Sequence, residues 1–285
     1  MNSKYIPSPK ILAVLAVLGW VYWPTFLDLY DAWTESPEYS HGMLVPFFAL
    51  YLLGRQKWDA AAIAKPWPIL GFGTLGLAVL LRLAGAATSF LPLEGLSFIL
   101  ALAAIAALSG GRTALTRFWQ PLVFLMFMVP LPYELERNVG GPLKTAATIS
   151  STFLLQTLGL PAIRDGNLIL IDEVRLGVVD ACSGLKMMVT FAAFSVGAVL
   201  MMQRSRFEKL MVLLGIVPIA VLTNVLRITA TGVSFSNVSD KGMQDFLHDM
   251  HGWLMMPVGL VLLAVELWML KKLVLDDGAP AALKS

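Results

Sequence analysis

The chain has 285 residues, of which 57% are hydrophobic and only 14% charged, and its mean hydropathy is +0.73. The charged fraction lies well below the roughly 25% of a soluble domain, which disfavours the alternative of a soluble protein with an unusually apolar core. A net charge of +2 without a block of like charges argues against nucleic acid as a partner. The single cysteine excludes an internal disulfide, and the three histidines do not form a zinc motif. We therefore expect a membrane protein with no metal or other cofactor.

The N-terminal apolar stretch, residues 11–27, follows Lys4 and Lys10 and has the form of a signal peptide. No small-x-small cleavage site follows it, because the next residues are Asp28-Leu29-Tyr30. The stretch is better interpreted as an uncleaved first membrane helix.

A helix that crosses a bilayer needs about 20 apolar residues, or fewer where flanking groups reach the interface. The sequence predicts an all-α, polytopic bundle that forms a single integral membrane domain over residues 1–285. The eight predicted spans cover residues 11–27, 42–54, 68–87, 93–109, 118–132, 183–202, 208–229 and 250–270. Arg82 and Glu94 fall near the outer ends of their spans, where a charged head group can reach the interface.

Charge sets the orientation of these spans. With the N-terminus inside, most Lys and Arg residues fall on one side, among them Arg55, Arg117 and Arg204, and most acidic residues fall on the other. The positive-inside rule then places both termini in the cytoplasm. We expect the protein in the inner (cytoplasmic) membrane.

An extracytoplasmic segment, residues 133–181, does not fit a plain bundle. Residues 143–160 are apolar on one face and rich in Ser and Thr on the other, which is typical of an interfacial or re-entrant helix. A full crossing here would put Arg204, Arg206 and Lys209 outside. Residues 167–180 predict a small β-hairpin on the outer surface, with its turn at Asp172-Glu173, leading directly into Cys182.

Cys182 directly precedes the sixth predicted span, so its thiol lies at a helix N-terminus. Unpaired N–H groups and the helix dipole at that position stabilise a thiolate. The alternative is that Cys182 is a small apolar filler, which is the usual role of a lone cysteine in a membrane bundle.

Arg227 lies near the outer end of the seventh predicted span, where a buried arginine needs a partner or water. It is either a site residue or a structural group that snorkels or pairs with Asp180 or Asp249. Asn224, three residues earlier, shares its helix face. Its amide has two possible partners, a substrate carbonyl or a neighbouring helix.

His248 and His251 lie three residues apart at the outer mouth of the eighth predicted span. A neutral imidazole accepts a proton from a thiol, and an imidazolium stabilises a thiolate. A histidine pair with this spacing also suits a metal, but no third ligand is evident. Asp249 either orients one of the rings or caps the helix. The predicted topology brings Cys182, Arg227 and His248 to the same membrane face.

These segments resemble the signature regions of the exosortase/archaeosortase family. The resemblance is carried by ACSGLK around Cys182, NVLRI around Arg227 and FLHDMHGW around His248, in that order along the chain. The first outer loop, Tyr39-Ser-His-Gly-Met-Leu-Val-Pro46, and the turn Met128-Val-Pro-Leu-Pro132 also resemble the family pattern. The resemblance runs over roughly residues 20 to 270 and agrees with an eight-span plan.

The resemblance implies a membrane-embedded cysteine transpeptidase or protease that processes membrane-anchored proteins with a C-terminal sorting signal. That signal is a PEP-CTERM-like motif followed by one membrane helix and a basic tail. Cys182 would be the nucleophile that forms a thioester, Arg227 the oxyanion stabiliser and His248 the general acid/base. The candidate substrate-binding or supporting residues are His41, Ser183, Lys186, Asn224, Asp249 and His251.

Three positions leave alternatives open. Many relatives have Arg where this chain has Lys186, and a small residue where it has His251, so two histidines compete for the base role. His41 either lines the site or hydrogen-bonds the outer loops. A rival function is that of a transporter or an exopolysaccharide- or lipid-handling protein, which predicts ionisable residues at mid-membrane depth. The sequence does not give the recognition motif, the acceptor nucleophile or the oligomeric state.

Overall fold

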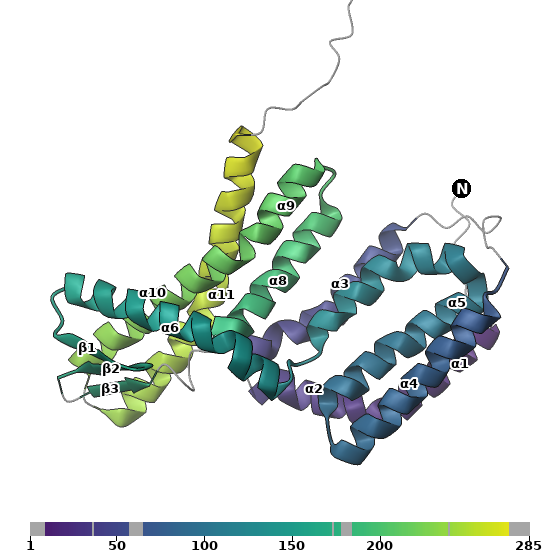
Figure 1. Cartoon of the computed structure of the whole chain (residues 1–285), viewed down its shortest axis with the longest axis horizontal. Helices are drawn as coiled ribbons and strands as arrows, with labels where there is room; N and C mark the ends of the chain where they lie inside the picture. The colour runs from purple at the N-terminus through teal and green to yellow at the C-terminus, as the bar shows by residue number, and fades with distance from the viewer. Residues whose placement is uncertain are drawn as a thin grey trace, which may run out of the picture. The chain divides into compact units, whose positions relative to one another are not determined.

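The computed structural model describes residues 9–35, 37–56, 65–172, 174–177, 184–238 and 240–273. The chain divides into two compact units, Met1–Pro132 and Tyr133–Ser285, which are described in turn below. Figure 1 shows both. The prediction of a single domain over the whole chain stays a prediction.

The first unit begins with a bent helix pair, α1 (Pro9–Val21) and α2 (Trp23–Glu35), whose axes differ by 60°. The bend falls at Tyr22, two residues before Pro24. A proline inside a helix lacks an N–H donor and clashes with the carbonyl four residues earlier, so the helix breaks there. The apolar stretch predicted as residues 11–27 is therefore two helices, and the second continues to Glu35.

A short 3₁₀ helix, η1 (Pro37–Met43), leads into α3 (Leu44–Arg55), and α4 (Pro68–Thr88), α5 (Leu91–Phe124) and the 3₁₀ helix η3 (Leu125–Met128) complete the unit. Gly111 interrupts α5 with φ 57° and ψ −142°. This conformation suits glycine, and the Lys65 carbonyl occupies the place of a Cβ. α5 therefore turns sharply at the boundary between two predicted spans (Figure 1).

The two halves of α5 pack on different helices. The first half lies antiparallel to α4, since Gly71 meets Leu108 and Gly85 meets Glu94. The second half packs against α3, where the Phe48 and Phe124 ring centroids are 4.6 Å apart.

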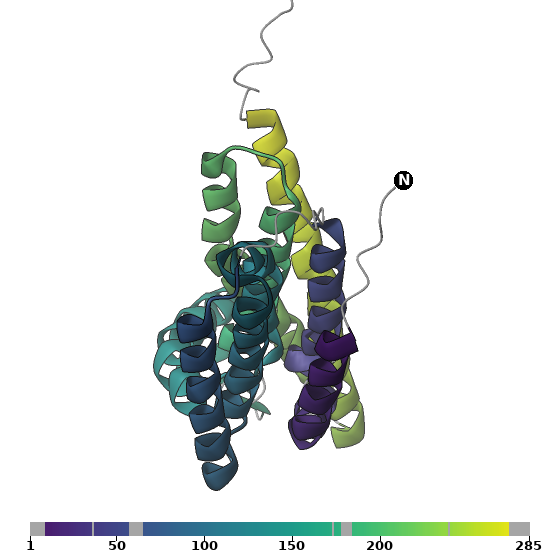
Figure 2. The same ribbon diagram turned by 90° about the vertical axis from the view of Figure 1, so that its right-hand side faces the viewer.

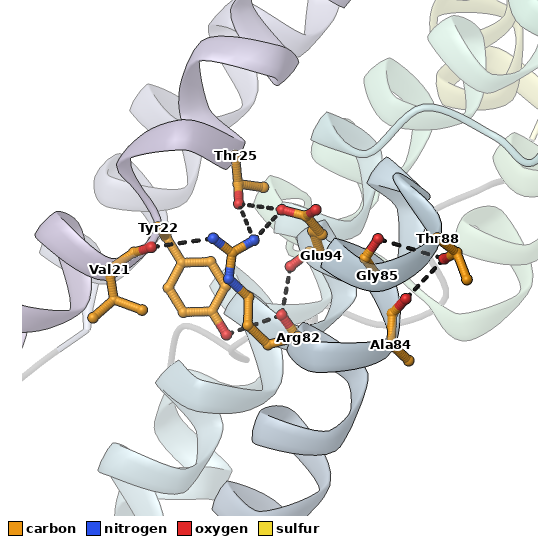
Figure 3. A network of polar contacts seen from close by, with 9 residues as sticks. Val21, Tyr22, Thr25, Arg82, Ala84, Gly85, Thr88 and Glu94 are labelled. Carbon is orange, nitrogen blue, oxygen red and sulfur yellow. Dashed lines mark hydrogen bonds and ion pairs between the residues drawn. The ribbon is translucent and has the colours of Figure 1, made fainter.

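A buried polar network joins the bent pair to α4 and α5 (Figure 3). Arg82 forms an ion pair with Glu94 and donates to Thr25 Oγ1 at 2.7 Å and to the Val21 carbonyl at 3.2 Å. Thr25 donates to the Glu94 carboxylate at 2.6 Å. The two charged groups are thus paired inside the unit instead of each reaching the interface alone, and Arg82 satisfies a carbonyl at the helix bend.

The second unit contains α6 (Tyr133–Thr157), three strands and four further helices. The strands β1 (Ala162–Asp165), β2 (Leu168–Ile171) and β3 (Val174–Gly177) form an antiparallel sheet in the order β1-β2-β3. The sequence predicted a two-stranded hairpin, and the structure has a third strand because the chain turns tightly at Gly166 (φ 60°) before it turns again at Asp172 (φ 51°). The helices are α8 (Gly184–Met201), α9 (Arg206–Leu214), α10 (Ile216–Asn237) and α11 (Lys241–Leu273).

Helix α6 buries its polar side. Thr148, Ser151 and Thr152 are buried, whereas Ile149 and Phe153 are exposed. Ser151 Oγ donates to the Val225 carbonyl on α10 at 3.3 Å. The outward apolar face suits a helix at a membrane boundary. α6 is not among the described helices long and apolar enough to span a membrane, and its interfacial position stays a prediction.

The core of this unit has two parts. Leu155 of α6 and Ile169 and Ile171 of β2 pack against Ile228 of α10. Farther along, Phe191 of α8, Val212 of α9 and Leu263 of α11 form a second cluster. In both views the α8–α9 turn and the end of α11 lie at one end of the unit (Figures 1 and 2). Basic Arg204, Lys271 and Lys272 are therefore gathered there, away from the sheet.

Four helices of the described residues are long and apolar enough to cross a membrane: Pro68–Thr88, Leu91–Met128, Arg206–Asn237 and Lys241–Leu273. The bent pair α1–α2 makes a fifth. The all-α polytopic fold is confirmed, but the count of eight spans is not. The predicted span 42–54 corresponds to the 12-residue α3, and the predicted spans 93–109 and 118–132 share the single kinked α5.

Candidate functional site

The candidate site is built where α10 and α11 run side by side in opposite directions. Gly215, at the start of α10, meets Glu266 near the end of α11, and Arg227 meets Gly252 near its beginning. Both helices extend beyond the predicted spans, α10 to Asn237 and α11 from Lys241. Arg227 and Gly252 therefore lie inside the helices and not at their ends.

Arg227 is almost completely buried, with 2% of its surface exposed. Its guanidinium lies against the backbone of α11 at Gly252, where an added Cβ would be 3.0 Å from Nη2 and 3.5 Å from Cζ. Only a glycine leaves this space empty. Arg227 is a site residue predicted from the sequence, whereas Gly252 is not. A signal was present, because an interior helical glycine is unfavourable unless something approaches the backbone closely.

His251 immediately precedes Gly252 and is also buried, with 8% exposed. Its Nδ1 lies 3.4 Å from the Thr231 hydroxyl on α10, one helical turn beyond Arg227. His251 is therefore anchored between the two helices, and Thr231 is a second member of the cluster that sequence reasoning did not select.

His248 lies one turn nearer the N-terminus of α11, and 24% of its side chain is exposed. Its Nδ1 is 3.4 Å from Asp249 Oδ1, and the Asp249 side chain is 74% exposed. The other ring nitrogen, Nε2, is buried and has no hydrogen-bond partner among the described residues. The ring is thus held loosely at one nitrogen while the other is available to a reacting group.

Asn224 lies on α10 on the opposite side of Arg227 from Thr231, and only 1% of it is exposed. Of the predicted residues, the structure thus brings together Arg227, His248, His251 and Asp249, and Asn224 lies one helical turn from Arg227 on α10. Cys182 and Ser183 lie outside the described residues. Lys186 falls in the first turn of α8.

A family model described as transmembrane exosortase matches residues 33–265 of the chain. The chain belongs to the transmembrane exosortase family. The match covers most of the chain and includes segments of both units. No curated protein and no solved structure matches the chain significantly. Family membership makes this protein a membrane sorting enzyme in the general sense, a membrane peptidase or transpeptidase.

Two further exosortase-like segments lie together in the first unit. His41 is buried on η1, next to Gly42, whose missing Cβ leaves room for the Trp33 indole. Trp33 Nε1 donates to the Met128 carbonyl at 2.9 Å, and the Leu131 amide donates to the Tyr39 hydroxyl at 3.3 Å. The segments 39–46 and 128–132 are therefore bound to each other.

The described part of the chain contains no set of side chains arranged to bind a metal ion. No group of three or more His, Cys, Asp or Glu side chains is close enough there to hold an ion. The groups at the α10–α11 site are one guanidinium, two imidazoles, one carboxylate and one amide. This set can hold an oxyanion, move a proton and bind a peptide group.

Proposed function

We propose that this exosortase is a cysteine transpeptidase or protease that cleaves the C-terminal sorting signal of exported proteins at the outer membrane face. The signal is a PEP-CTERM-like motif, a membrane helix and a basic tail. The observation that carries the proposal is the burial of the Arg227 guanidinium against Gly252, one turn from His248, whose Nε2 has no partner among the described residues. A cation and a proton carrier on facing helices are the two groups that amide cleavage by a thiol requires.

The reaction begins with Cys182. Its thiolate sulfur attacks the carbonyl carbon of the scissile peptide bond, and the carbonyl oxygen becomes an oxyanion. Arg227 stabilises this oxyanion, and N–H groups at the start of α8 add to it. His248 in its protonated form gives a proton to the leaving nitrogen as the carbon–nitrogen bond breaks. A thioester on Cys182 remains.

An acceptor then resolves the thioester. A water or amine attacks the thioester carbon, His248 removes the proton, and the carbon–sulfur bond breaks to restore the thiolate. Asp249 holds Nδ1 of His248 so that Nε2 carries the transferred proton. Ser183, Lys186 and His41 support substrate binding. The enzyme occupies the inner membrane with both termini in the cytoplasm and its site facing the periplasm or exterior.

The decisive test uses a tagged substrate that carries a sorting signal, co-produced with the enzyme in cells. Cys182→Ala and Cys182→Ser should reach the membrane at normal levels and leave the substrate uncut, whereas Gly141→Ala should process it normally. Gly141 is a suitable control because nothing lies within 4 Å of an added Cβ there. Full processing by Cys182→Ala would overturn the proposal.

A further inference from the structure

Asn224 carries a polar group that the described fold does not use. Neither its Nδ2 nor its Oδ1 has a hydrogen-bond partner among the described residues, although the side chain is 99% buried. A buried amide that makes no hydrogen bond is unfavourable, and native proteins rarely keep one without a reason.

Neighbouring polar groups behave differently. The adjacent Thr223 donates to the Ile219 carbonyl of its own helix at 2.7 Å, and Ser151 of α6 donates to the Val225 carbonyl at 3.3 Å. Local backbone acceptors are therefore within reach of buried hydroxyls in this region. On α10 the Thr229 hydroxyl and the Asn224 amide have no such partner among the described residues, and Asn224 lacks one for both its donor and its acceptor. This indicates that the partner of the amide comes from outside the described residues.

The antiparallel packing of α10 and α11 fixes the order of the groups along the site. Gly252 faces Arg227, and His248 lies one turn before Gly252, toward the end of α10. Asn224 lies one turn from Arg227 in the opposite direction, toward the apolar first half of α10. A chain that passes along this face meets the imidazole, then the guanidinium, then the amide.

The chemistry of an amide selects its ligand. Asn224 offers one acceptor and a pair of donors. A carboxylate or phosphate would leave Oδ1 unsatisfied, and an ammonium group would leave Nδ2 unsatisfied. A peptide group satisfies both, because its N–H donates and its C=O accepts. The entry to a helix is an especially good match, since the N–H groups of the first turn have no partner within the helix and the carbonyls that precede the helix are also free.

We infer that Asn224 binds the backbone of the substrate on the membrane side of the scissile bond, at the first turn of the substrate's membrane helix. The inference rests on the proposed function, because it assumes a substrate that enters the membrane directly after the cleaved bond. Asn224 is a positioning residue for the part of the substrate that leaves. Because the contact is to backbone atoms, Asn224 recognises the start of a helix in the substrate and not particular side chains.

The test compares Asn224→Leu and Asn224→Asp with the matched control Thr223→Val. Each purified enzyme is assayed for its melting temperature in detergent and for cleavage of a sorting-signal substrate in vesicles. Leu removes an unsatisfied amide, so Asn224→Leu should melt at or above the parent temperature while kcat/KM falls about 10- to 100-fold. Asn224→Asp keeps the acceptor and loses the donor, so its kcat/KM should also fall. Thr223→Val should melt lower and cleave normally.

A substrate-side change completes the test. Proline is placed in turn at the first four positions of the substrate's membrane helix, where it removes one N–H and is tolerated. With the parent enzyme one position should reduce cleavage about 10-fold, and with Asn224→Leu the same proline should cause no further loss. Independent, additive losses would overturn the inference, as would a fall in melting temperature that accounts for the lost activity of Asn224→Leu. Cleavage by Cys182→Ala in the same assay would instead overturn the proposed function.

Discussion

The guanidinium of Arg227 on α10 rests on the backbone of Gly252 on α11, 3.0 Å from the position that a Cβ would occupy. This contact places a fixed positive charge beside two histidines in the interior of a membrane enzyme. The space at Gly252 accommodates an arginine side chain that is 98% buried. The guanidinium fits at this place because residue 252 has no side chain.

Gly252→Ala should therefore reduce processing of a sorting-signal substrate about 10-fold without removing the enzyme from the membrane. The new methyl group displaces the guanidinium by a few tenths of an ångström, and catalytic groups are sensitive to shifts of this size. Gly141→Ala, in an open part of α6, is the matched control and should leave activity unchanged. The measurement is the cleaved fraction of substrate per enzyme, read by immunoblot. Equal activity of the two alanine variants would contradict the role given to this contact.

Arg227→Lys should lose most of its activity, and Arg227→Met should lose about 10²- to 10³-fold, which is the usual effect of removing an oxyanion-stabilising donor. Lysine keeps the charge, but its single ammonium cannot reproduce the planar guanidinium that lies against Gly252. Both variants should reach the membrane at the level of the parent, which an immunoblot of the membrane fraction checks. Normal cleavage by Arg227→Met would remove Arg227 from the reaction.

The sequence predicted the α10–α11 site better than it predicted the supporting contacts. Arg227 and the two histidines stand out because charged and imidazole groups are rare in apolar segments. Gly252 and Thr231 do not stand out, since a glycine and a threonine are ordinary residues in membrane helices. Their importance depends on which helix lies opposite, and packing between distant segments is not encoded in local periodicity.

The two histidines should respond differently to substitution. His248→Gln should abolish cleavage, because Nε2 of His248 is buried, unpartnered among the described residues and able to carry a proton. His251→Gln should lower cleavage to a smaller extent, and Thr231→Val should match it, since each removes one half of the Thr231–His251 contact. Asp249→Asn should cost less than 10-fold because the Asp249 carboxylate is largely exposed and its contact with His248 is long. A more severe defect in His251→Gln than in His248→Gln would reverse the assignment.

Helix boundaries and span counts show where sequence reasoning reaches its limit. The predicted span 183–202 coincides with the helix α8, Gly184–Met201, but α8 is not among the described helices long and apolar enough to cross a membrane. The predicted break between 93–109 and 118–132 is present, but as a kink at Gly111 inside one helix. A glycine in an apolar run has too little local signal to distinguish a kink from a loop. The conformation is set by the Lys65 carbonyl, which belongs to a segment far away in the sequence.

The Arg82–Glu94 pair should be a stability element and not part of the reaction. Arg82→Leu or Glu94→Leu alone leaves the other charge poorly compensated, and breaking a buried pair typically costs about 3 kcal/mol or more. The double variant should lose less stability than the sum of the losses of the two single variants. Melting temperatures in detergent measure this coupling. Additive effects of the two substitutions would show that the charges do not depend on each other.

The orientation of the second unit can be tested with the single cysteine of the chain. A membrane-impermeant maleimide should label Cys182 in intact cells, because the predicted topology places it on the outer face. Two reporters in a Cys182→Ser background calibrate the assay: Asn237→Cys at the far end of α10 should be labelled, and Gln203→Cys in the α8–α9 turn should be protected until the cells are permeabilised. Both positions are exposed. The opposite pattern would invert the topology and put the Arg227 site on the cytoplasmic side, where an exported sorting signal does not reach it.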